Sequence, residues 1–316
     1  MFTGCGKVSE ESILKEIASK TKNSYMLYGE LSILNNDNVY NYEVEVSYKK
    51  DNYYKVSLTN ISNNHNQIIL KNEDGVYVLT PSLNKSFKFQ SDWPYNNSQI
   101  YLIDSLLSDI KNDKDRIFKE NEKSYEFVTK VNYPNNQNLV NQRITIDKEF
   151  NITEIKIFDS NDSIKMELDI DKIDYSPTFN DDYFTIDFIM ESFSELDVFD
   201  EISLVDESIY PLFLPEGTKL ANSEKLKLDN GERIIMTFDG DKPFLLVEET
   251  SNVMDEFTVI PTSGEPYMLM DTLGVMTSNS LSWSTGGVDY YLVSDVLNTD
   301  ELVEIAQSIS AMPTMK

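Results

Sequence analysis

The chain has one cysteine, and it stands fifth in the sequence, between Gly4 and Gly6. A free cysteine is usually buried in a core or kept for its reactivity. A residue in a terminal segment has few neighbours against which it could be buried. We therefore expect Cys5 to be chemically modified rather than packed.

The one histidine, His65, lies in the polar stretch from Ser62 to Asn66. A metal site or a catalytic triad would need partner residues that no motif supplies here. The phosphate-loop, dinucleotide and serine-hydrolase motifs are also missing from the sequence. We expect His65 to lie in a surface turn, and the chain to have no catalytic residue, no metal site and no cofactor.

Carboxylates are the remaining candidates for catalysis, because the chain has 54 acidic residues. In such a chain, neighbours such as Asp181 and Asp182 arise by chance, and Asp169 and Asp171 alternate as solvated side chains of a strand would. A hydrolase would instead need two acids facing each other across a cleft, about 5 to 10 Å apart. A carboxylate-dependent cell-wall hydrolase stays open as the alternative function.

The charge balance limits the choice of partners. Against the 54 acidic residues there are 27 basic ones, which gives a net charge of -27. Such a chain is repelled by nucleic acid phosphates and by anionic lipid headgroups, so we expect no nucleic acid partner. No apolar run approaches the roughly 18 residues of a membrane span. A single cysteine excludes an internal disulfide.

Most of the chain up to residue 190 shows the two-residue alternation of half-buried strands. A helix is expected after the N-cap Ser9, and a second one is expected over residues 98–110. A meander of this length favours an open barrel or a strongly curved sheet. We expect one apolar face of that sheet to form its concave side, with the side chains Leu31, Ile33, Val44, Val46, Val56 and Leu58.

The pattern changes after residue 190. The next stretch is acidic and loses the alternation, and a second set of short strands is expected to begin at Tyr210. Asn298 and Glu301 form a capping pair before the last helix. The expected fold class is α+β, mainly antiparallel β, with four segments: a tether over 1–8, a first domain over 9–190, an acidic connector over 191–207 and a small α+β domain over 208–316.

The residues around Cys5 resemble a known processing signal. Phe2-Thr3-Gly4-Cys5 is similar to a bacterial lipobox, in which a small residue precedes the cysteine that becomes diacylated. The resemblance implies that Cys5 anchors the protein in a membrane. The charged and apolar regions of a signal peptide do not precede it, and Phe2 stands where leucine is usual. We therefore expect Met1 to be an internal residue of a longer precursor.

The body of the chain resembles the LolA/LolB family of lipoprotein carriers. The resemblance rests on the hairpin with Asp-Gly-Val-Tyr-x-x-x-Pro at residues 74–81 and on the order of elements over residues 9–190. The C-terminal part, with Leu214-Pro215-Glu216-Gly217, is similar to a domain of unknown function in Firmicute sporulation and envelope lipoproteins. The combination resembles LolA-like sporulation or germination lipoproteins, and no catalytic residue comes with it.

The resemblance implies a non-enzymatic lipoprotein on the extracytoplasmic face of the cell membrane, held there by acylated Cys5. Its first domain would bind either an apolar ligand or a protein partner in envelope assembly, spore assembly or germination. The concave face should separate these two versions. A carrier needs a cavity that stays open, whereas an interaction module can fill the same face with side chains.

Overall fold

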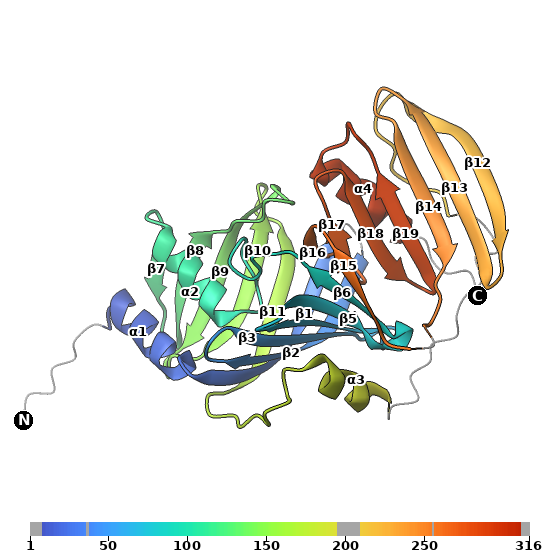
Figure 1. The fold of residues 1–316 in the computed structure, drawn as a ribbon. Helices are drawn as coiled ribbons and strands as arrows, with labels where there is room; N and C mark the ends of the chain where they lie inside the picture. The colour runs from blue at the N-terminus through green and yellow to red at the C-terminus, as the bar shows by residue number, and fades with distance from the viewer. Residues whose placement is uncertain (1–7, 36–37, 195–208, 255, 311–316) are drawn as a thin grey trace, which may run out of the picture.

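The structure is a computed structural model that describes residues 8–35, 38–194, 209–254 and 256–310, and it contains two sheets (Figure 1). The larger sheet has twelve strands and curves strongly, while the smaller one has seven and stands beside one end of it. The order of strands across the larger sheet is β15 (Thr258–Thr262), β6 (Lys85–Phe89), β5 (Gly75–Thr80), β4 (Asn66–Asn72), β3 (Tyr53–Asn60), β2 (Asn38–Lys49), β1 (Ser24–Asn35), β11 (Ile164–Asp174), β10 (Ile152–Asp159), β9 (Leu139–Asp147), β8 (Ser124–Lys130) and β7 (Ile117–Glu120).

Two helices and a loop cover the concave side of the large sheet. They are α1 (Glu10–Thr21), α2 (Ile103–Asn112) and residues 93–102, whose apolar side chains join those of the strands in one core. The hydroxyl of Ser9 accepts a hydrogen bond from the Ser12 N–H and caps α1, as its sequence position predicts. The fold class expected from the sequence, mainly antiparallel β in a strongly curved sheet with short helices, is confirmed.

An irregularity helps the large sheet to bend. The register between β1 and β11 shifts between Tyr28 and Gly29, and a Cβ at Gly29 would overlap the carbonyl oxygen of Asp169. Only glycine lets the two backbones approach so closely. A bulge of this kind increases the local twist of the strand, which supports the curvature.

The convex side of the large sheet is covered by α3 (Ile186–Ser194), which lies below the sheet in Figure 1. Phe184 and Ile189 are buried there against Ile68 and Leu70 of β4. Helix α3 runs across residue 190, where the sequence pattern places the end of the first domain. The rest of the expected acidic connector, residues 195–207, lies outside the described residues, and the domain bounds stay a prediction.

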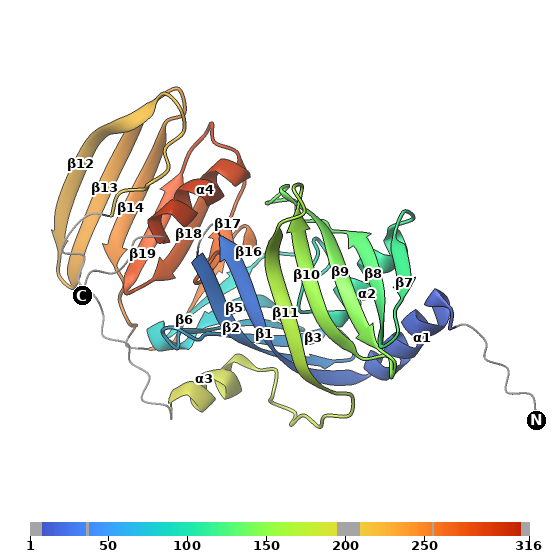
Figure 2. The same cartoon turned by 180° about the vertical axis from the view of Figure 1, so that it is seen from behind.

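The smaller sheet carries one helix on one face. Its strands, in spatial order, are β12 (Thr218–Leu228), β13 (Gly231–Gly240), β14 (Phe244–Thr250), β19 (Val288–Val293), β18 (Ser280–Thr285), β17 (Leu273–Met276) and β16 (Glu265–Met268). Helix α4 (Thr299–Ser310) lies in front of this sheet in Figure 2. Its capping pair is as predicted: the Glu301 N–H donates to Asn298 Oδ1 at 2.9 Å and the Asn298 N–H to Glu301 Oε2 at 3.2 Å.

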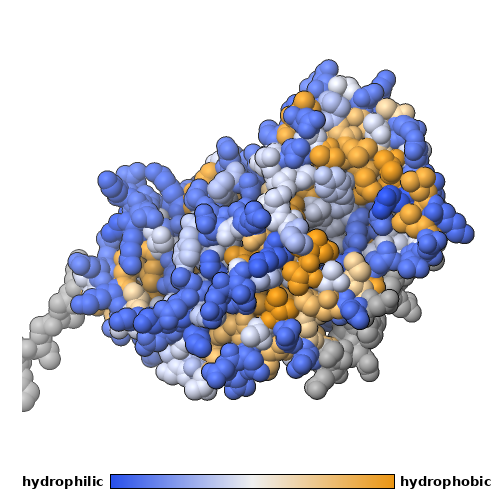
Figure 3. Space-filling view, in the orientation of Figure 1, coloured by the Kyte–Doolittle hydropathy of each residue, from blue (hydrophilic) through white to orange (hydrophobic). Residues whose placement is uncertain are grey.

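On the other face of the smaller sheet, the described part of the chain places no helix. Ile235, Val247 and Tyr291 stand side by side there on three paired strands. In Figure 3 apolar side chains gather over this part of the molecule, at the upper right. The second set of strands begins at Thr218 rather than at Tyr210, so the prediction of its start was wrong, because the apolar run 210–215 forms no strand.

Strand β15 links the two halves of the chain. It comes from the C-terminal part of the sequence, yet it pairs in parallel with β6 at the edge of the large sheet. The C-terminal half of the chain is therefore joined to the large sheet by main-chain hydrogen bonds as well as by side chains. Among the helices that the structure describes, none has the length and apolar character needed to cross a membrane.

Candidate binding cleft between the two sheets

The six side chains expected on the concave face lie together, as the alternation predicts. All of them belong to the core of the large sheet and are buried, with exposed fractions between 0 and 6%: Leu31, Ile33, Val44, Val46, Val56 and Leu58. Helices α1 and α2 contribute to the same core. This face is filled with protein side chains in the described structure, and a binding role for the six residues stays a proposal.

A hairpin of the smaller sheet contributes to this filling. Leu273 and Val275 on β17 belong to the core of the large sheet. They follow strand β11 of that sheet by about a hundred residues in the sequence. The hydroxyl of Tyr42 donates to the carbonyl oxygen of Met270, in the turn between β16 and β17, at 2.7 Å. The hairpin therefore packs into the mouth of the curved sheet.

Gln67 of β4 fixes the hairpin by three hydrogen bonds. Its Oε1 accepts from the Leu273 N–H at 2.5 Å and from the Thr272 hydroxyl at 3.0 Å. Its Nε2 donates to the Leu273 carbonyl oxygen at 3.2 Å. Gln67 and Thr272 are both buried, so each of these polar groups needs its partner.

A cleft of about 540 Å³ lies beside the hairpin, between the edge of the curved sheet and helix α4. Its volume is in the range of roughly 300–1,000 Å³ typical of ligand sites. Apolar side chains from both halves line it, together with polar ones from α4; the main contributors are Ile33, Met166, Leu212, Phe213, Tyr267, Met268, Met270, Val303 and Glu304. The cavity beneath it holds only about 60 Å³, room for a few water molecules.

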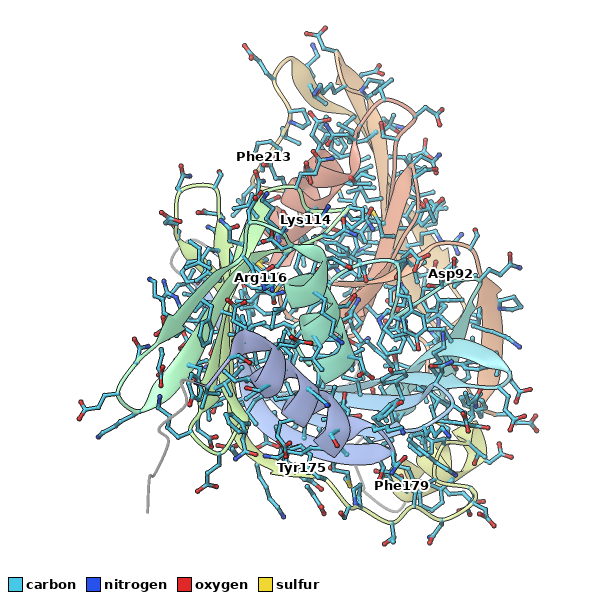
Figure 4. The ribbon with its side chains drawn as sticks, turned by 90° about the vertical axis from the view of Figure 1, so that its left-hand side faces the viewer. Asp92, Lys114, Arg116, Tyr175, Phe179 and Phe213 are labelled. Carbon is cyan, nitrogen blue, oxygen red and sulfur yellow. The ribbon has the colours of Figure 1, made fainter. Side chains whose placement is uncertain are left out.

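The rim of this cleft is unusually apolar. Leu212 is 67% exposed and Phe213 is 39% exposed, and both line the cleft. Figure 4 labels Phe213 on the segment that leads into the smaller sheet. Large apolar side chains that stay exposed beside a concave site are typical of interaction surfaces.

The charges in the cleft suit binding rather than proton transfer. Asp300 and Glu304 both come from α4, one helical turn apart, and Lys165 stands on β11. Burial raises the pKa of the Tyr267 hydroxyl, so that group stays neutral near physiological pH. The two acids lie on one helix and do not face each other from opposite walls, as a pair of hydrolytic carboxylates would.

A second cavity, of about 650 Å³, is lined by acidic residues of one segment, Asp104 to Asp115. Burial raises the pKa of Asp104, although Tyr54 donates a hydrogen bond to it at 3.1 Å. Burial also raises the pKa of Asp109, which accepts from Gln142 Nε2 at 2.8 Å. Asp104 and Asp109 belong to one stretch of chain, and both accept hydrogen bonds from neighbouring side chains. These hydrogen bonds account for the two buried carboxylates as structural groups.

Three further acids lie close together on the strands β10 and β11. Glu154, Glu167 and Asp169 have carboxylate oxygens within 4.8 Å of one another. Lys156 Nζ pairs with Glu154 at 2.7 Å and with Glu167 at 3.0 Å, so a protein cation already occupies part of the cluster. Burial and the neighbouring acids raise the pKa of Asp169.

Of the other two residues singled out in the sequence, His65 does not line the cleft. His65 lies in the turn between β3 and β4, where its N–H donates to Asn63 Oδ1 at 2.9 Å. Cys5 lies outside the described residues, so its acylation stays a prediction.

Glu248 is a buried acid that the sequence reasoning missed. Its side chain is fully buried on β14, and Oε2 accepts a hydrogen bond from the Ile209 N–H at 3.1 Å. Burial raises its pKa to about 7. The signal was present in the alternation, because Glu248 continues the inward phase of Phe244 and Leu246.

Comparison with known proteins finds one extensive sequence relative. No family model matches the chain. The chain is 37% identical over 314 residues to the sporulation protein YdcC of Bacillus subtilis (strain 168). The aligned region covers 98% of this chain and 93% of that protein.

The solved structures that match the chain do so with low TM-scores and low sequence identity. A chain in the complex of MucA and MucB from Pseudomonas aeruginosa gives a TM-score of 0.35 at 12% identity, covering 94% of this chain and 98% of that one. A LolA superfamily protein from Nitrosomonas europaea gives a TM-score of 0.33 at 12% identity, covering 57% of this chain and 99% of that one.

Proposed function

Because this chain belongs to the family of the sporulation protein YdcC, we propose that it acts in spore formation as a non-enzymatic protein of the cell envelope that binds a protein partner. The relationship to a sporulation protein supports the proposed cellular process. The filled concave face and the apolar cleft rim support the binding role.

The filling of the concave face is the observation that carries this proposal. A lipid carrier of this architecture needs room for an acyl chain inside the curved sheet. That space holds Leu31, Val46 and Val56, all fully buried, and the β16–β17 hairpin packs into its mouth. The exposed apolar side chains instead line the neighbouring cleft, where a partner can reach Leu212 and Phe213.

Anchoring at the extracytoplasmic face of the membrane through acylated Cys5 is part of the proposal. The support is the lipobox-like Phe2-Thr3-Gly4-Cys5 followed by a polar stretch. Two acyl chains hold a protein stably where one chain binds only marginally. The Cys5→Ser variant of the full-length precursor should leave the membrane fraction with an unchanged circular dichroism spectrum, and its retention in that fraction would refute the anchor.

Purification of the full-length protein from membranes of sporulating cells tests the binding role. Mass spectrometry then reports co-purifying proteins and lipids. We expect one protein to be recovered in stoichiometric amount and its recovery to fall at least tenfold with Leu212→Glu. Ile61→Glu is the matched control, because Ile61 is also exposed but lies in a turn and does not line the cleft.

Two outcomes would contradict the proposal. Equal recovery of the protein with Leu212→Glu and Ile61→Glu would show that the cleft rim is not the binding surface. A stoichiometric lipid without any protein would favour the carrier function, and the concave face would then have to open to admit it.

A further inference from the structure

A second groove lies at the end of the molecule opposite the smaller sheet. It runs between α1 and β7, has a volume of about 860 Å³, and does not touch the cleft described above. Figure 4 views the molecule from this side, with α1 in front and Arg116 labelled nearby. Its lining combines apolar and charged side chains: Val8, Ser9, Glu10, Glu11, Leu14, Lys15, Ala18, Lys111, Arg116 and Phe118.

The apolar part of this surface extends beyond the groove. Ile117 follows Arg116 in the chain, begins the edge strand β7 and is 52% exposed. Phe118 is half-buried within the groove and packs against the core of the large sheet. Covering this exposed isoleucine and the apolar part of the groove with another apolar phase is favourable, because it removes apolar surface from water.

This end of the molecule also differs from the rest in charge. The two segments that build it, residues 10–22 and 111–123, contain eight basic and seven acidic residues. The whole chain has a net charge of -27, so the rest of the molecule is strongly acidic. Taken together, the remaining residues are therefore repelled by an anionic surface more strongly than this end is.

The position of the proposed anchor points to the same end. Cys5 precedes Val8 by three residues, and Val8 lines the groove. Three residues of fully extended chain span at most about 11 Å. A diacylated Cys5 would therefore hold the groove within about 11 Å of the lipid to which it is attached.

We propose that the α1–β7 groove, with Ile117 and the surrounding lysines, is the membrane-facing surface of the protein and contacts anionic phospholipids of the leaflet that holds Cys5. This inference rests on the proposed anchoring through Cys5. Ile117 meets the upper acyl methylenes, while Lys15 and Lys111 of the groove and Lys119 of β7 meet the phosphates. The smaller sheet and the cleft then point away from the membrane.

Fluorescence of the full-length acylated protein in vesicles tests this orientation. Cys5 is the only native cysteine and is blocked by its lipid, so Ile117→Cys supplies a single reactive thiol for an environment-sensitive dye. The vesicles contain phosphatidylglycerol and phosphatidylethanolamine, with a spin-labelled lipid as quencher. We expect at least twofold quenching at residue 117 and none at the matched Tyr291→Cys site on the smaller sheet, which is similarly exposed.

Charge reversal tests the lipid contact itself. The double change Lys111→Glu and Lys119→Glu should reduce quenching at residue 117 at least twofold. The same reversal on the edge strand β12, Lys219→Glu and Lys227→Glu, should leave it unchanged.

Flotation of the same vesicles separates this inference from the anchoring. If the protein floats and residues 117 and 291 are quenched equally, the orientation is wrong while the anchor stands. If the protein does not float, both the anchor and the orientation are refuted.

Discussion

The hydroxyl of Tyr42 on β2 donates a hydrogen bond to the carbonyl oxygen of Met270, 228 residues further along the chain. Tyr42 and Met270 are both buried, and the bond joins the curved sheet to the tip of a hairpin from the other sheet. Burial and the nearby charge of Asp271 raise the pKa of the Tyr42 hydroxyl, so it stays a donor over the physiological range.

Tyr42→Phe should lower the free energy of unfolding by about 1–2 kcal/mol, because it removes a buried hydrogen bond that joins the two sheets. Urea denaturation at pH 7 measures the loss. Tyr291→Phe removes the same hydroxyl from an exposed ring and should change stability by less than about 0.5 kcal/mol. Equal effects of the two changes would mean that the hairpin contact does not stabilise the fold.

Gln67→Met keeps the length of the side chain but removes all three hydrogen bonds to the hairpin. It leaves the Leu273 N–H without that partner in a buried site, so we expect a loss of about 2–4 kcal/mol. Gln137→Met, at an exposed loop position, is the control. A loss no larger than that of the control in urea titrations would argue against a fixed hairpin.

Val46→Asp places a carboxylate on the filled concave face, where Val46 is fully buried. Among the buried apolar side chains of this core, an unpaired charge should cost about 3 kcal/mol or more. Val39→Asp lies on the same strand at a site that is 56% exposed and should be nearly neutral. A small effect at residue 46 would reveal a hydrated cavity and revive the carrier function.

Glu248 should make stability depend on pH. Its pKa is raised from 4.5 to about 7 in the folded protein, so the folded state binds the proton more tightly than the unfolded one. The stability from this group is complete below about pH 4.5 and is lost as the pH rises through about 7, a total of roughly 3 kcal/mol.

The Glu248→Gln variant cannot ionise, so it should gain stability relative to the native protein between pH 5 and pH 8. Urea denaturation at both pH values measures the gain. Glu16→Gln, on the exposed side of α1, is the control and should show no such gain. A pH-independent difference between Glu248→Gln and the native protein would contradict a raised pKa.

Local patterns predicted much of the first half of the fold. Alternation placed Val44, Val46, Val56 and Leu58 on one buried face, because a half-buried strand repeats every two residues. Capping residues placed the starts of α1 and α4, because the hydrogen bonds that define a cap span only three residues.

Long-range features could not be predicted in the same way. The run Leu273 to Met276 is buried throughout and therefore has no alternation to show which core it joins. The parallel pairing of β15 with β6 depends on where the chain returns after residue 250, which no local signal encodes. The cleft was missed for the same reason, since its walls come from distant segments.

Strand β15 and the β16–β17 hairpin come from the C-terminal half of the chain but pack on the large sheet, and this affects the order in which the protein folds. Leu273 and Val275 complete the core of the large sheet, and β15 completes its edge. During synthesis the N-terminal end of the chain appears first. The core therefore cannot close until residue 275 has been made, about a hundred residues after strand β11 is complete. Until then the apolar mouth of the large sheet stays uncovered, and such transiently exposed apolar surface makes a folding intermediate prone to aggregation.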